Sequence, residues 1–205
     1  MRPALGCSAL LLAAGLGAAP LEAQDPRLAA RLPTGTRLAV ERLLDSARAS
    51  GLPTEPLVRK ALEGESKGAD SARIVSAVAT LGRYLGQARQ ALGTGADEAT
   101  LVAGAAALRA GAQPARLRAL DSLRARERLA VPLSVLADLL TSGVEPERAW
   151  TTVREMATQG APDADFLELR ERLMGTRQGQ APGLPPAAER PPTAAPLPAP
   201  HGPSP

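Results

Sequence analysis

Residues 51–57 read Gly-Leu-Pro-Thr-Glu-Pro-Leu, and they contain both the end of one predicted helix and the start of the next. Glycine is common just beyond a helix C-terminus, while proline with hydroxyl or acidic residues is typical of a helix start. The same arrangement recurs along the chain: a glycine, an apolar residue directly after it, and a second apolar residue six positions after the glycine. This Gly-apolar pattern predicts short helices joined by tight turns. It begins at Gly51, Gly68, Gly95, Gly111, Gly143 and Gly160.

The hydrophobic periodicity between these glycines predicts an all-α fold of about eight short helices. No segment alternates apolar and polar residues as a strand would, so no sheet is expected. Three glycine pairs have nearly equal spacing and favour stacked helical hairpins, in a solenoid-like array or an irregular bundle. True duplication and chance matching in a chain rich in Ala and Leu both remain open, and Gly104 fits the pattern from inside a helix. The predicted helices are residues 36–50, 54–63, 71–92, 98–110, 114–128, 132–141, 146–160 and 163–175.

Three segments are predicted along the chain. Residues 1–23 resemble a secretory signal peptide, with Arg2 before an uncharged run and Ala23 before the expected cut. Residues 24–175 form the helical domain, and residues 176–205 are a disordered tail rich in Pro and Ala. An uncleaved anchor and a lipoprotein modified at Cys7 are the alternatives to a cleaved signal. The mature protein is therefore expected in the periplasm or outside the cell, without a transmembrane segment.

Composition excludes several chemistries. Cys7 is the only cysteine and is expected to leave with the signal, and His201 is the only histidine and lies in the tail. The domain is thus expected to lack disulfides, a thiol nucleophile, a transition-metal site and any cofactor. Aromatic residues are nearly absent, so the core should consist of Leu, Val and Ala. Trp150 and Phe166 fall in consecutive predicted helices and are expected to pack together.

One short motif invites a catalytic interpretation. Residues 64–68 match G-x-S-x-G, which in α/β-hydrolases is a sharp turn that exposes a nucleophilic serine between a strand and a helix. Here a helix precedes it and no general base is available, so we interpret residues 64–68 as the connector between two helices. Carboxylates gather around this Glu63–Asp70 turn and at residues 163–168. Helix capping accounts for the second group, and the scarcity of aromatics argues against a sugar-binding groove.

A second candidate is a run of arginines in the predicted helix 114–128. Asp121 and Glu127 interrupt the run and no aromatic residue interleaves with it, so nucleic-acid binding is not expected. Contact with anionic lipid or wall polymer remains open. The interaction candidates of this helix are Arg116, Arg118, Arg124, Arg126 and Arg128.

The sequence therefore favours a non-enzymatic interaction or scaffold module of the bacterial cell envelope. Its expected partner is another envelope protein, because stacked hairpins form extended surfaces that bind polypeptides. One alternative is a cell-wall-processing or other hydrolase that uses carboxylates near the Glu63–Asp70 turn. A further alternative is a module that associates with anionic surfaces through the helix from Arg116 to Arg128.

Overall fold

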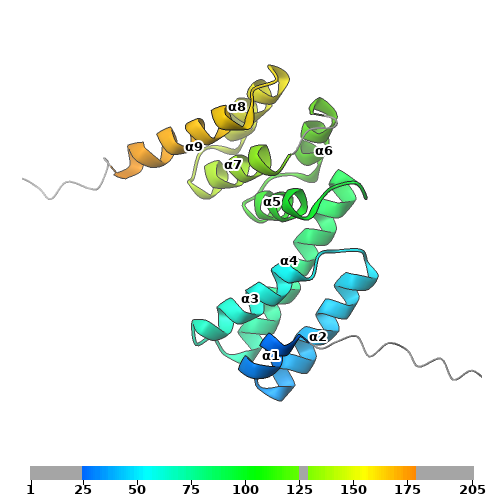
Figure 1. Cartoon of the computed structure of the whole chain (residues 1–205). Coiled ribbons are helices and arrows are strands. Elements are labelled where there is room, and N and C mark those ends of the chain that lie inside the picture. Colours follow the sequence, from blue (N-terminus) through cyan, green and yellow to red (C-terminus); the bar gives the residue numbers. More distant parts are fainter. Residues whose placement is uncertain (1–24, 125–128, 179–205) are drawn as a thin grey trace, which may run out of the picture. The chain divides into compact units, whose positions relative to one another are not determined.

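The structure, a computed structural model, describes residues 25–124 and 129–178. Within these ranges the protein is all-α, with nine helices and no strand, which confirms the predicted fold class (Figure 1). The described residues form two compact units whose boundary falls between Arg83 and Tyr84, inside one helix. The predicted signal peptide with Cys7, residues 125–128 with Arg126 and Arg128, and the residues from 179 onward with His201 lie outside the described residues.

Unit 1 comprises helices α1 (Pro26–Arg31), α2 (Thr34–Ala49) and α3 (Glu55–Ser66), together with the first part of α4 (Ser71–Leu92). Helix α1 packs against both α2 and α3, and α2 packs against α3. The core of this unit consists of aliphatic side chains that are fully or almost fully buried. They include Leu28, Val40, Leu57, Ala61 and Val78.

Unit 2 contains the end of α4, then α5 (Glu98–Arg109), α6 (Pro114–Leu123), α7 (Ala130–Thr141), α8 (Pro146–Thr158) and α9 (Asp163–Gln178). Helix α7 lies between α5 and α9, while α8 packs on α6 and α7 (Figure 1). The helices of unit 2 thus stack alternately, with α5, α7 and α9 in one layer and α6 and α8 in the other. This is the packing expected of consecutive helical hairpins.

The Gly-apolar pattern has a defined structural meaning at five of its six glycines. Each of the five has a positive φ and donates its N–H to the carbonyl three residues back. The apolar residue that follows donates to the carbonyl five residues back, which completes a Schellman motif. The five glycines are Gly51, Gly68, Gly111, Gly143 and Gly160.

The second apolar residue of the pattern enters the core in every case, with at most 4% of its surface exposed. It lies in the first turns of the helix that follows the glycine, so the pattern both ends one helix and anchors the next. These residues are Leu57, Ile74, Leu101, Leu117, Ala149 and Phe166.

The prediction that Gly95, the remaining glycine of the Gly-apolar pattern, ends a helix was wrong. The glycine with positive φ at the end of α4 is Gly93, not Gly95, and its N–H donates to the carbonyl of Arg89 at 2.9 Å. The side chain of Arg89 also reaches the carbonyl of Thr94 at 2.8 Å. A longer connector therefore joins α4 to α5, and Gly95 lies within it.

Several helices also differ from the predictions. Helix α1 was not predicted, because a six-residue helix shows little periodicity. Helix α3 continues to Ser66, so Gly64 belongs to its last turn and not to a connector. Helix α6 ends at Leu123, with Arg124 as its C-cap, and the rest of the predicted helix, residues 125–128, lies outside the described residues. Helix α9 reaches Gln178, past the expected end near residue 175.

Gly104 explains how closely the helices of unit 2 approach one another. A Cβ placed on this residue would lie 3.0 Å from Leu92 Cδ1, 3.2 Å from Ala88 Cβ and 3.3 Å from Leu117 Cδ2. The glycine therefore lets α5 lie directly against α4 and α6. Its match to the Gly-apolar pattern is coincidental, because it lies inside α5 and does not end a helix.

Candidate interaction site

Arg116, in the first turn of α6, faces the start of α8. Its guanidinium donates to the backbone carbonyl of Pro146 at 2.8 Å and forms an ion pair with Glu147. It also lies over the ring of Trp150, 5.6 Å from the ring centroid, in the range of a cation–π contact. The side chain is only 12% exposed. Arg116 thus joins α6 to α8 within unit 2.

Arg124, the C-cap of α6, reaches the turn between α8 and α9. It donates to the carbonyl of Ala161 at 2.7 Å, and its Nη2 lies 3.6 Å from the Asp163 carboxylate. Its guanidinium carbon is 5.4 Å from the centroid of the Phe166 ring. With 6% of its side chain exposed, Arg124 is buried within unit 2. A buried arginine needs such partners, because an unpaired buried charge is strongly unfavourable.

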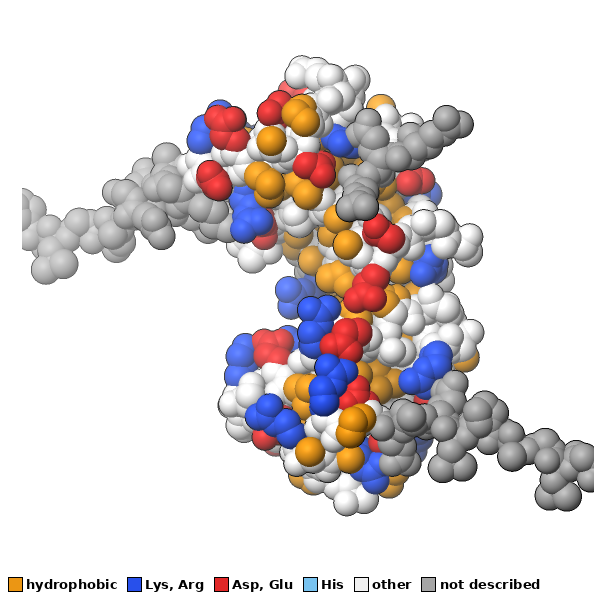
Figure 2. All heavy atoms as spheres, viewed as in Figure 1, with side chains coloured by type: hydrophobic (Ala, Val, Ile, Leu, Met, Phe, Trp, Pro, Cys, Tyr) orange, Lys and Arg blue, Asp and Glu red, His pale blue; other side chains and the backbone are white. Residues whose placement is uncertain are grey.

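The predicted arginine cluster is therefore not a continuous basic face among the described residues. Two of its members pack inward, Arg118 lies exposed on α6, and the other two lie outside the described residues. Figure 2 shows basic and acidic side chains interspersed over the visible face. The sequence could not separate the inward-facing arginines from the exposed one, because α6 places them on different sides at positions that hydropathy alone does not distinguish.

Trp150 and Phe166 each lie beneath an arginine, Arg116 of α6 for the first and Arg124 at the C-cap of α6 for the second. Phe166 is fully buried and Trp150 is partly exposed. Their expected contact with each other stays a prediction. The arrangement favours a structural role, since each ring is already covered by a guanidinium.

The G-x-S-x-G string lies at the end of α3 in a setting unlike a nucleophile turn. Ser66 Oγ donates to the carbonyl of Glu63 at 2.9 Å, as serines in a last helical turn often do. Lys60 and Lys67 both donate to the Glu63 carboxylate, at 2.9 Å and 2.5 Å. These two bonds lower the pKa of Glu63 to about 2, with Lys67 as the larger cause. Glu63 is therefore ionised at neutral pH and suited to an ion pair, not to proton donation.

The other carboxylates of the Glu63–Asp70 turn also have structural partners. Glu65 lies 3.0 Å from Arg31 of α1. Asp70 accepts a hydrogen bond from the backbone N–H of Arg73 at 2.8 Å, which caps the start of α4. These contacts explain why acidic residues gather here without requiring catalysis.

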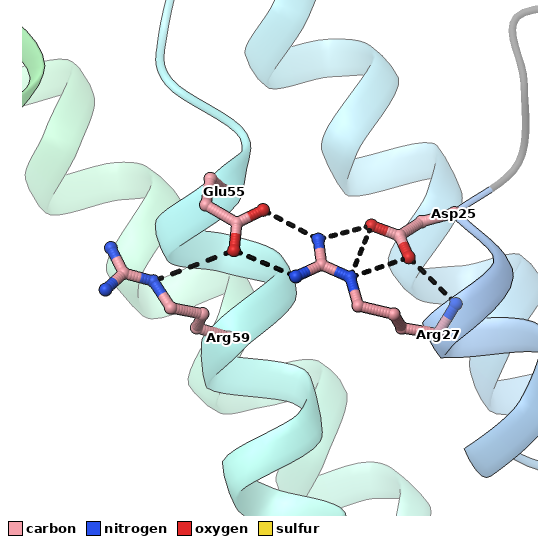
Figure 3. A network of polar contacts seen from close by, with 4 residues as sticks. All are labelled: Asp25, Arg27, Glu55 and Arg59. Carbon is pink, nitrogen blue, oxygen red and sulfur yellow. Dashed lines mark hydrogen bonds and ion pairs between the residues drawn. The ribbon is translucent and has the colours of Figure 1, made fainter.

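A different charged group was missed by the sequence analysis, and it lies on unit 1. Asp25 caps α1 and pairs with Arg27, which also binds Glu55 at the start of α3 (Figure 3). Arg59 extends the row, with its Nε 3.9 Å from Glu55. The Arg27 guanidinium lowers the pKa of both carboxyls. The Asp-Pro dipeptide at 25–26, a typical helix start, was the available signal.

Two kinds of feature could hold a small molecule or an ion, namely cavities and clusters of metal-ligating side chains. A pocket between α7 and α9, lined in part by Asp138, Ser142 and Arg170, has a volume of about 10 Å³. That is roughly the space one water molecule needs and far below the roughly 300 Å³ of a small-molecule site. Within residues 25–124 and 129–178, no three potential metal-ligating side chains come together. No helix in the described part of the chain is long and apolar enough to cross a bilayer.

Comparison of the chain with protein-family models, with curated proteins and with solved structures gave no match.

Proposed function

We propose that this chain is a bacterial envelope protein that binds another polypeptide through its helical units and performs no catalysis itself. The observation that carries the proposal is the alternate stacking of α5, α7 and α9 over α6 and α8. Stacks of helical hairpins expose side chains from several successive helices on one surface, and such surfaces commonly bind peptides and proteins.

A hydrolase is the less well supported alternative, because the carboxylates that would act in catalysis already have structural partners. Glu63 has a pKa of about 2, Glu65 is paired with Arg31, and Asp70 caps a helix. A general acid needs a raised pKa and a site for substrate. An anionic-surface module receives less support as well, because Arg116 and Arg124 are engaged inside unit 2.

Two exposed leucines of unit 2 offer positions at which contact with a partner can be tested. Leu123 at the end of α6 is 44% exposed and Leu167 on α9 is 41% exposed. Single exposed leucines are ordinary on protein surfaces, so they serve as probe positions and not as evidence.

Export is the second part of the proposal. Asp25 caps α1 two residues after the predicted cut at Ala23, so loss of residues 1–23 would leave every described helix intact. The test is the intact mass and N-terminal sequence of the protein recovered from a periplasmic fraction. A start close to Gln24 supports export, and recovery of the unprocessed chain from the cytoplasm contradicts it.

Binding is tested with a photo-crosslinking amino acid placed at Leu123 or Leu167 in the full chain expressed in its own host. We expect a discrete crosslinked polypeptide at one or both positions. The matched control is the same probe at Leu133, a fully buried position of α7, which should give no intermolecular product. Absence of a product at both exposed positions, with hydrolysis of cell-wall glycan that Glu65→Gln abolishes, would contradict the binding role.

A further inference from the structure

Helix α1 is held on unit 1 by a small apolar contact and by exposed ion pairs. It spans six residues, Pro26–Arg31, and is separated from α2 by Leu32 and Pro33. A helix this short is not stable by itself in water, because helix nucleation is unfavourable. Its helical form therefore depends on its packing against α2 and α3.

Two apolar side chains supply the hydrophobic part of this packing. Leu28 is fully buried and Leu32 is 6% exposed, whereas the remaining residues from Pro26 to Arg31 are exposed. The burial of two leucines is opposed by the conformational entropy lost when the whole segment is ordered. The docked and undocked forms of α1 are consequently closer in free energy than the folded and unfolded forms of unit 1.

Ion pairs on the surface complete the attachment. Arg27 Nη1 and Nη2 donate to the two oxygens of Glu55 at 3.0 Å and 2.7 Å (Figure 3). A second pair, between Arg31 and Glu65, has a distance of 3.0 Å. Both pairs connect α1 to α3. The side chains of Arg27 and Glu55 are 48% and 45% exposed, so dissolved salt screens their attraction.

The rest of unit 1 has connections that do not involve α1. Thr36 of α2 donates to Ser71 of α4 through their hydroxyls at 2.6 Å. Gly64 of α3 lies against Ile74 of α4, where a Cβ would be 3.0 Å from the isoleucine Cγ1. These contacts join α2 and α3 to α4 independently of the first helix.

We propose that α1 is a releasable clasp, which detaches from α2 and α3 while the remaining helices of unit 1 stay folded. Salt concentration sets the fraction released, because the Arg27–Glu55 and Arg31–Glu65 pairs weaken as salt rises. Release uncovers the apolar sites occupied by Leu28 and Leu32, so the clasp controls when unit 1 exposes them. This inference is independent of the proposed function.

Native-state hydrogen exchange on the full chain tests the clasp. The amides of Leu28, Ala29 and Leu32 are hydrogen-bonded within or at the end of α1. At low salt we expect them to exchange at least tenfold faster than the amides at the centre of α3. In 1 M NaCl their exchange should rise several-fold further, while exchange in α3 stays constant.

Substitutions of Arg27 test whether the ion pairs cause the salt dependence of hydrogen exchange in α1. Arg27→Met should speed α1 exchange at low salt and reduce its salt dependence, and Arg27→Lys should retain that dependence. Arg73→Met is the matched control, since Arg73 is an exposed arginine of the same unit that pairs locally with Asp70 at 3.7 Å. It should leave α1 exchange unchanged. Unchanged exchange in α3 reports that each variant is folded.

The proposal fails if α1 and α3 exchange at the same rate under all conditions, because unit 1 then opens as one cooperative body. It fails equally if α1 exchanges faster than α3 but responds neither to salt nor to Arg27→Met, since the ion pairs then do not govern release.

Discussion

The contact of α1 with α3 and that of α5 with α7 show two different ways of joining alternate helices. In unit 1, α1 contributes two buried leucines and a row of exposed charges. In unit 2, seven of the twelve residues of α5 and six of the twelve residues of α7 are buried, and nearly all of these are small or aliphatic. The comparison teaches that one architecture can contain a charged, salt-sensitive attachment and an apolar one that salt hardly affects.

The largest expected effect is that of Phe166→Ala in α9, which tests the apolar packing of unit 2. Phe166 is fully buried, so its truncation should lower the free energy of unfolding by about 3–5 kcal/mol. The neighbouring Leu167 is 41% exposed, and Leu167→Ala should change it by no more than about 0.5 kcal/mol. Urea denaturation at low and high salt measures both. Equal losses, or a loss at Phe166 that depends on salt, would contradict the comparison.

The close approach of helices in unit 2 predicts the next largest effect. Gly104→Val should cost about 1–3 kcal/mol, because its added carbon atoms meet Leu92, Ala88 and Leu117. Gly95→Val is the control, since nothing lies within 4 Å of a Cβ at Gly95. Thermal unfolding of the two variants should differ clearly. Similar melting temperatures would show that α5 can move away without loss.

In unit 1, a substitution of Gly51 in the turn after α2 should lower the free energy of unfolding by about 1–2 kcal/mol through its backbone conformation alone. Gly51 has a φ of 65°, and no atom lies within 4 Å of a Cβ at this position. Gly51→Ala should therefore destabilise through the left-handed conformation. Gly35→Ala, in helical backbone with equally open space, should stabilise by up to about 1 kcal/mol. Effects of the same sign, measured by urea denaturation, would refute this explanation.

The smallest expected effect concerns the charges of α3. The folded pKa of Glu63 is about 2, against 4.5 as its ordinary value, so its contribution to stability is complete above pH 4.5. That contribution is lost as the pH falls from 4.5 toward 2. Because the group is exposed, the loss should not exceed about 1 kcal/mol.

Glu63→Gln should remove this component from the pH profile of the free energy of unfolding between pH 4.5 and 2. Glu155→Gln, at an exposed position of α8, is the control and should leave the component in place. An unchanged profile in Glu63→Gln would mean that the lysine pairs do not stabilise the folded state.

The fold could be predicted from sequence because its signals are local. A Schellman turn depends on a glycine and its immediate neighbours, and the buried residue six positions later follows from helix geometry. This is why five of the six glycines end a helix as the pattern predicts, and why the apolar residue six positions later is buried in all six cases. Gly93 was missed because Thr94 follows it, so the apolar half of the pattern is absent.

The candidate sites were harder to predict, because they depend on which side chains meet across helices. Arg116 and Arg124 read as surface charges, yet they pair with Glu147 and Asp163 on later helices. Arg27 and Glu55 meet across the space between α1 and α3, and the sequence does not show that α1 folds back. The caps at Asp70 and Asp97 are of a more predictable kind, because each carboxylate accepts from a backbone N–H only three residues further along the chain.

The Schellman turns also carry a consequence for kinetics. Each turn closes the end of its helix through hydrogen bonds between residues at most five apart, and the helices then pack on helices one or two positions away in the chain, so many native contacts are local in sequence. Proteins with such low contact order fold in roughly microseconds to milliseconds. A chain of this kind can acquire its structure progressively from one end, with each hairpin forming before the following one is available.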